Sequence, residues 1–237
     1  EAESIMARAV MRWGIVLAFV ASVALIVSST LATPDAPDTM DGQAVLPPAA
    51  ALDLDAYARA IEPRDWAFPA DHGAHPEFQT EWWYYTGNLA AEDGRRFGYQ
   101  FTIFRRALTP DETESVSEWR ANQAYMAHFT VTDVSGEQFY QVQRFSRGAA
   151  RLAGAEAEPR YRVWLDDWSV EARADEAIQT SLTARSPEVA VDLALEQAKP
   201  PALQGDGGLS PKSAEPGNAS YYYSLSRLET SGTIRIG

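Results

Sequence analysis

The stretch that decides the fold is His75-Pro76-Glu77-Phe78-Gln79-Thr80-Glu81-Trp82-Trp83-Tyr84-Tyr85-Thr86-Gly87-Asn88. Four consecutive aromatic residues come directly after a carboxylate in it. Aromatic and β-branched residues in a short run favour a β-strand. This stretch therefore predicts a strand that begins near Glu81.

Both faces of this strand carry large rings, because side chains alternate along a strand. Neither face is plainly suited to water, which favours the wall of a barrel with one face in outer packing and the other at an interior cavity. The plainer alternative is an aromatic core strand that touches no ligand. The first face carries Trp82, Tyr84 and Thr86, and the second carries Glu81, Trp83, Tyr85 and Gly87.

The composition supports a folded protein with a sizeable core, since 46% of the residues are hydrophobic. The length of 237 residues is enough for one large or two small domains. The absence of cysteine excludes disulfides, thiolate metal sites and a cysteine nucleophile. The net charge of -13 would repel phosphate backbones, and no basic stripe occurs along the chain. We therefore expect no nucleic-acid partner.

The N-terminal segment predicts export. Arg8 and Arg12 precede an uncharged apolar run over residues 13–32. A run of this length can span a bilayer, and the basic residues before it keep the N-terminus cytoplasmic. The same pattern describes a signal peptide that ends at Thr30-Leu31-Ala32. Residues 1–32 are thus a membrane anchor or a cleaved signal, and either would export the rest of the chain.

The rest of the chain divides into a linker and an all-β domain. Residues 33–56 are rich in Pro, Ala and Asp and show no apolar period, which is typical of a flexible linker. Residues 57–237 contain about nine short strands at hairpin spacing, a pattern that predicts an antiparallel barrel or sandwich. The expected strands are 81–89, 97–105, 124–134, 138–146, 161–172, 178–184, 189–195, 221–228 and 232–236.

The usual hydrolase and metal motifs are missing. Neither G-x-S-x-G nor H-E-x-x-H occurs, and no Gly-rich phosphate loop is present. His72 and His75 have a spacing that brings two imidazoles together, but a catalytic metal site usually needs a third protein ligand. We expect no metal there; the alternative is two loop histidines that make turn hydrogen bonds.

Two residues are candidates for acid–base chemistry. His128 lies in the middle of a predicted strand, opposite its more apolar face. If that face lines a cavity, His128 can exchange a proton near neutral pH, and if it is solvated, His128 is an ordinary surface residue. Glu81, beside indole and phenol rings, would act as an acid if it is screened from water. The alternative is a rim carboxylate paired with Arg105 or Arg106.

Five segments, taken together and in order, resemble the AttH-like family related to carotenoid 1,2-hydratases. The resemblance covers about residues 63–237. The segments are residues 75–89, 97–106 (FGYQFTIFRR), 127–133 (AHFTVTD), 143–147 (QRFSR) and 221–228 (YYYSLSRL).

This resemblance implies a lipocalin-like β-domain with a ligand cavity, in a bacterial protein of the "predicted secreted hydrolase" branch. That branch is exported to the periplasm, and its members often accompany ABC-transporter permeases. Family members usually continue into a second domain, which we expect to be missing after Gly237.

The leading hypothesis is therefore an exported protein that binds a hydrophobic lipid, isoprenoid or polyene, beside an ABC-transporter permease and tethered to or released from the inner membrane. The alternative is a cofactor-free hydro-lyase that protonates a polyene and adds water, with aromatic faces that stabilise the cation. The candidate catalytic residues are Glu81 and His128. The candidate ligand-binding residues are Trp82, Trp83, Tyr84, Tyr85, Gln100, Arg105 and Tyr222.

Overall fold

The computed structural model describes residues 56–110, 121–173 and 178–237. The contacts divide the chain into residues 1–50 and 51–237, and all described residues belong to the second unit. The apolar run at 13–32 and almost all of the predicted linker lie outside the described residues, so the anchor, the signal and the linker stay predictions. Within the described ranges, no helix combines the length and the hydropathy needed to cross a bilayer.

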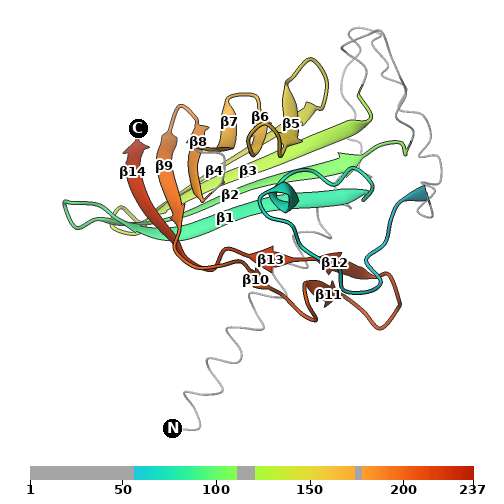
Figure 1. Cartoon of the computed structure of the whole chain (residues 1–237). Helices are drawn as coiled ribbons and strands as arrows, with labels where there is room; N and C mark the ends of the chain where they lie inside the picture. Colours follow the sequence, from blue (N-terminus) through green and yellow to red (C-terminus); the bar gives the residue numbers. More distant parts are fainter. Residues whose placement is uncertain (1–55, 111–120, 174–177) are drawn as a thin grey trace, which may run out of the picture. The chain divides into compact units, whose positions relative to one another are not determined.

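The first sheet has four antiparallel strands in the order β1-β2-β3-β4 (Figure 1). Short turns join β1 to β2 and β3 to β4 as hairpins, as the alternating sequence pattern predicts. At the β3–β4 turn, the Asp133 carboxylate accepts the backbone N–H groups of Ser135 and Gly136 at 3.0 and 2.9 Å. The strands are β1 (Thr80–Ala90), β2 (Arg96–Ala107), β3 (Gln123–Asp133) and β4 (Gln138–Arg147).

The second sheet has six antiparallel strands in the order β14-β9-β8-β7-β6-β5. Its strands are β5 (Ala153–Glu156), β6 (Arg162–Leu165), β7 (Trp168–Ala172), β8 (Gln179–Arg185), β9 (Val189–Gln197) and β14 (Leu228–Ile236). Between β9 and β14 lie two short ladders, formed by β10 (Ala202–Leu203) with β13 (Tyr223–Ser224) and by β11 (Leu209–Pro211) with β12 (Ala219–Tyr221).

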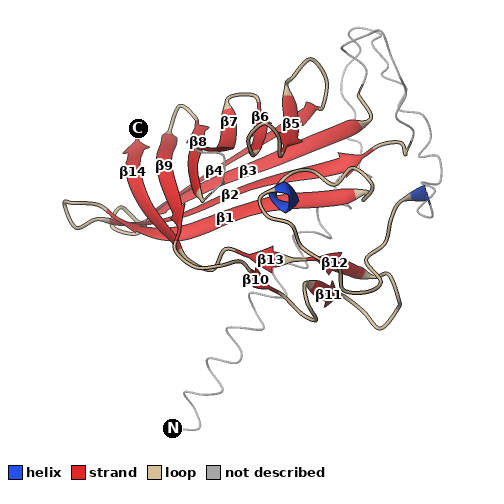
Figure 2. Cartoon of the chain, viewed as in Figure 1, coloured by secondary structure: helices blue, strands red, loops and turns tan. Residues whose placement is uncertain are grey.

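The two sheets form a sandwich. Figure 2 shows strands throughout, with only short helical turns such as η2 (Ala70–His72). In the described part of the chain no ladder joins one large sheet to the other, so they do not close into a barrel. The predicted all-β antiparallel fold is therefore confirmed as a sandwich, and the barrel form of the prediction is wrong.

The core between the sheets is built around Trp168. This residue of β7 is fully buried, and its ring meets Phe101 of β2 and Phe129 of β3 edge-on, with centroids 6.2 and 5.7 Å away. Edge-to-face pairs add about 0.5–1.5 kcal/mol each beyond the burial of their area. Arg144 of β4 lies 4.1 Å from the Trp168 ring centre. One indole thus ties three strands of the first sheet to the second.

The burial along β1 decides which of its two faces is the outer one. Trp82 and Tyr84 are 37% and 51% exposed, whereas Trp83 is 7% exposed. The register places Tyr84 opposite Thr102, and Thr102 opposite His128, so all three share the outer face. Of the two settings considered for His128, the interior cavity is therefore excluded, because the face toward the second sheet is the one that carries Trp83 and Tyr85.

The single strand predicted for residues 161–172 is two strands, β6 and β7. Asp166 adopts a φ of 54°, a left-handed conformation that reverses the chain between them. Asp167 then forms an ion pair with Arg144 of β4. The aspartate pair is therefore a turn, and this turn brings Trp168 into the core.

Candidate functional site

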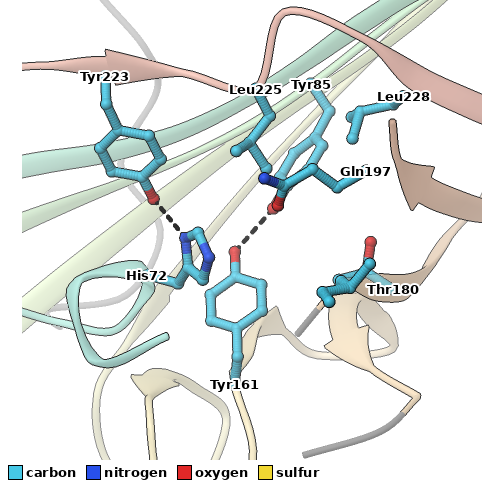
Figure 3. Close-up of a pocket in the computed structure, with 9 residues that line it drawn as sticks. His72, Tyr85, Tyr161, Thr180, Gln197, Tyr223, Leu225 and Leu228 are labelled. Carbon is cyan, nitrogen blue, oxygen red and sulfur yellow. Dashed lines mark hydrogen bonds between the residues drawn. The ribbon is translucent and has the colours of Figure 1, made fainter. Parts of the chain in front are cut away.

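The candidate site is a small pocket whose lining residues come from both sheets and from the segments between them (Figure 3). Its cavity volume is about 20 Å³, and the free space of the hollow, open mouth included, is about 320 Å³. The inner part holds about one water-sized group. The walls come from η2, from β1 of one sheet, from β8, β9 and β14 of the other, from β13, and from the loops between. The lining residues are His72, Tyr85, Tyr161, Ile178, Thr180, Gln197, Tyr223, Leu225 and Leu228.

His72 forms one polar pair of this pocket. Its Nδ1 lies 2.7 Å from the hydroxyl of Tyr223, a residue of β13 that is distant in sequence. Burial lowers the pKa of His72 to about 4, although the neighbouring Asp71 carboxylate opposes this shift. His72 is therefore a neutral imidazole at neutral pH. The Trp83 side chain fixes the backbone of His72, because Trp83 Nε1 donates a hydrogen bond to the His72 carbonyl oxygen at 2.8 Å.

Tyr85 and Tyr161 form a second polar pair. Their hydroxyl oxygens are 2.8 Å apart, which is hydrogen-bond distance. Burial raises the pKa of Tyr85 to about 12 and that of Tyr161 well above its ordinary value. Burial also raises the pKa of Tyr223. All three phenols are therefore protonated at neutral pH, and the inner wall of the pocket is uncharged.

A chain of ion pairs beside the pocket holds η2 against β1. His75 Nε2 lies 3.0 Å from Asp71 Oδ1, and His75 Nδ1 lies 2.7 Å from Glu81 Oε1. The hydrogen bond to Glu81 is the main reason why the pKa of His75 is raised, which outweighs burial. An arginine extends this series of ion pairs at each end. Arg64 Nη2 lies 2.6 Å from Asp71 Oδ1, and Arg105 Nε lies 3.1 Å from Glu81 Oε2. Since Asp71 precedes His72, this network positions the imidazole.

Of the predicted catalytic residues, neither lies in the pocket. Both carboxylate oxygens of Glu81 are used within the network, where Oε2 accepts from the His75 backbone N–H and from Arg105 Nε. The alternative prediction, a carboxylate paired with Arg105, is thus what the structure contains. His128 lies on the outer face, half-buried, and its Nε2 has no hydrogen-bond partner among the described residues.

The predicted ligand-binding residues are dispersed, and only Tyr85 among them lines the pocket. Trp83 lies in the core, where it supports His72. Arg105 is 1% exposed and donates to the His75 and Phe78 carbonyl oxygens, a structural role. The others lie elsewhere: Trp82, Tyr84 and Gln100 on the outer face of the first sheet, and Tyr222 at 39% exposure beside Lys212.

Several polar residues of the pocket are absent from the sequence-based prediction. The spacing of His72 and His75 suggests only a metal pair or two turn residues, yet the two imidazoles turn to different partners. Tyr223 belongs to a three-tyrosine run of which the prediction names Tyr222. Since alternate side chains point to opposite sides, the run itself implies that its members have different surroundings. Tyr161 carries no local signal, because its partner Tyr85 is 76 positions away.

Comparisons with known proteins place this chain in a family. The family model described as AttH-like matches residues 59–237. A crystal structure of an AttH protein from Nitrosomonas europaea superposes with a TM-score of 0.65 at 31% sequence identity, covering 76% of this chain and 52% of that chain. The present chain thus spans about half the length of that relative. No curated protein matches it. The chain belongs to the AttH-like family.

Proposed function

We propose that this protein binds a small, mainly apolar molecule, with the end of that molecule in the pocket between the two sheets. The observation that carries the proposal is the pocket wall, where aliphatic Ile178, Leu225 and Leu228 lie beside a buried cluster of phenol and imidazole groups. Ligand sites combine apolar walls with a few placed polar groups in this way. The enclosed part is small, so the body of a lipid, isoprenoid or polyene would lie at the open mouth.

We further propose that the protein acts after export to the periplasm, tethered by its N-terminal segment or released from it, and beside an ABC-transporter permease. The apolar run at residues 13–32 and the two arginines before it support export. The permease is suggested by the family resemblance alone. A hydrophobic ligand handed to or from a membrane transporter would suit a site that holds one end of a molecule and leaves the rest accessible.

Binding is better supported than hydration of a double bond. Protonation of an alkene needs a strong acid, whereas the lining residues include no carboxyl group and their phenols have raised pKa values. Glu81, the predicted acid, is engaged by His75 and Arg105. The AttH-like relative shares the fold, and its description adds no reaction.

The experiment is a titration of the full chain with retinol, an apolar isoprenoid that ends in a hydroxyl, monitored by energy transfer from tryptophan to the probe. We expect saturable binding of one molecule. Leu225→Trp fills the mouth of the pocket, and we expect it to weaken binding at least tenfold. Phe145→Ser is the matched control, because Phe145 is 68% exposed on the outer face of the first sheet. We expect this control to bind as the wild type does.

Two results would contradict the proposal. One is the absence of saturable binding by the folded wild-type chain. The other is the reverse pattern, in which Phe145→Ser loses affinity and Leu225→Trp keeps it, because the probe would then lie on the outer sheet face. Mass spectrometry of an acyclic polyene after incubation tests hydration separately, since a gain of one water per molecule would establish the hydro-lyase instead.

A further inference from the structure

The hydroxyl groups of Tyr85 and Tyr161 in the pocket carry one O–H hydrogen more than their mutual hydrogen bond uses. Tyr85 and Tyr161 carry one O–H each, and their oxygens are 2.8 Å apart. Their mutual hydrogen bond uses one of these two hydrogens. The described residues offer neither hydroxyl a second partner. The second hydrogen is therefore available to an acceptor that enters the pocket.

The surroundings of the pocket disfavour a negatively charged ligand. The lining residues include no lysine or arginine. The pKa of Tyr223 is raised mainly by burial. The neighbouring Tyr85, Asp71 and Glu81 act in the same direction, in that order, and Arg64 opposes them as the smallest influence. Glu81 acts on Tyr161 in the same direction. A buried anion here would lose its water without gaining a cation, which costs several kcal/mol in general.

Part of the pocket wall is aliphatic. Ile178, Leu225 and Leu228 line it, and Ile178 is 44% exposed. In Figure 3, Leu228 lies on the side of the pocket away from His72, and Leu225 lies between Tyr223 and Tyr85. The phenol pair therefore shares the pocket with aliphatic side chains, which an apolar molecule would contact.

We propose that the ligand is an apolar molecule that ends in a neutral hydrogen-bond acceptor, a hydroxyl or a carbonyl group, and that this oxygen accepts the spare hydrogen of the Tyr85–Tyr161 pair. This inference rests on the proposed binding function and adds the chemical class of the ligand. It assigns recognition to two phenols, where an anion-binding pocket would use a cation.

The test compares probes that share one polyene body. Retinol, retinal and retinoate differ only at the end group, and at pH 8 retinoate is an anion. We expect the full chain to bind retinol and retinal at least tenfold more tightly than retinoate. Retinoate binding as tight as retinol binding would overturn the ligand class and leave the binding function standing. Failure of all three probes to bind would overturn both.

A double variant tests the role of the phenol pair. Tyr85→Phe with Tyr161→Phe removes both hydroxyls and keeps both rings. One lost hydrogen bond corresponds to about a 3- to 10-fold loss of retinol affinity. Affinity for the hydrocarbon analogue that lacks the oxygen should not fall. Each single variant keeps one phenol hydrogen and should retain most of the preference for retinol over the hydrocarbon. If the double variant is folded, as judged by its thermal midpoint, and that preference is unchanged, the assignment is wrong.

Discussion

At the scale of single residues, the most informative group is His75, which lies between two carboxylates. Its contacts with Asp71 and Glu81 raise its pKa above the unfolded value of 6.5. A raised pKa means that the folded state binds the proton more tightly. The stabilisation by His75 is therefore fully present below about pH 6.5 and is lost as the pH rises through the folded pKa.

The prediction is that His75→Gln lowers the free energy of unfolding by about 1–3 kcal/mol at pH 6, the usual range for hydrogen bonds to charged groups. The difference from the wild type should shrink between pH 6 and pH 9, as the pH rises through the folded pKa and the wild-type imidazole loses its proton. Urea unfolding at both pH values measures it. His128→Gln is the control, since burial lowers the pKa of His128 and its removal should not reproduce this trend. A difference that stays constant with pH would show that the charge of His75 is not involved.

At the scale of one element, β1 separates structural from exposed aromatic residues by alternation alone. Trp83 is buried and donates to the His72 carbonyl, whereas its neighbour Tyr84 is 51% exposed. Removing a buried aromatic side chain typically costs about 3–5 kcal/mol, while most exposed positions change stability by less than about 1 kcal/mol. Neighbouring residues of similar size thus serve as a matched pair.

We predict that Trp83→Ala lowers the free energy of unfolding by about 3–5 kcal/mol and that Tyr84→Ala lowers it by less than about 1 kcal/mol. Chemical denaturation of the two variants measures both. Trp83→Ala should also weaken retinol binding in the fraction that remains folded, because His72 loses its support. Equal costs at the two positions would mean that the faces of β1 are assigned wrongly.

At the scale of the whole described domain, the sequence predicted the longer strands well and their assembly less well. The predicted strand 221–228 is wrong, because β12 ends at Tyr221, β13 covers only Tyr223–Ser224, and β14 begins at Leu228. The alternation in residues 97–105 and 124–134 is local, and β2 and β3 appear there. Which face of β1 meets water depends on a second sheet that lies far along the chain, so the aromatic stretch alone could not decide it. The pocket was harder still, because His72, Tyr85 and Tyr223 meet only after both sheets and the β13 segment have packed.

The contact between the sheets decides how the domain unfolds, and Trp168 is its centre. Because this indole touches Phe101 and Phe129 of the opposite sheet, we expect Trp168→Leu to destabilise both sheets together. Large-to-small changes at such buried aromatic positions cost about 2–5 kcal/mol. Native-state hydrogen exchange should show equal losses of protection in β2, β3, β8 and β9, with Phe139→Ser, at a 62% exposed position, as the unchanged control. Loss confined to β8 and β9 would mean that the sheets open separately, and the pocket between them would then form and dissolve without global unfolding.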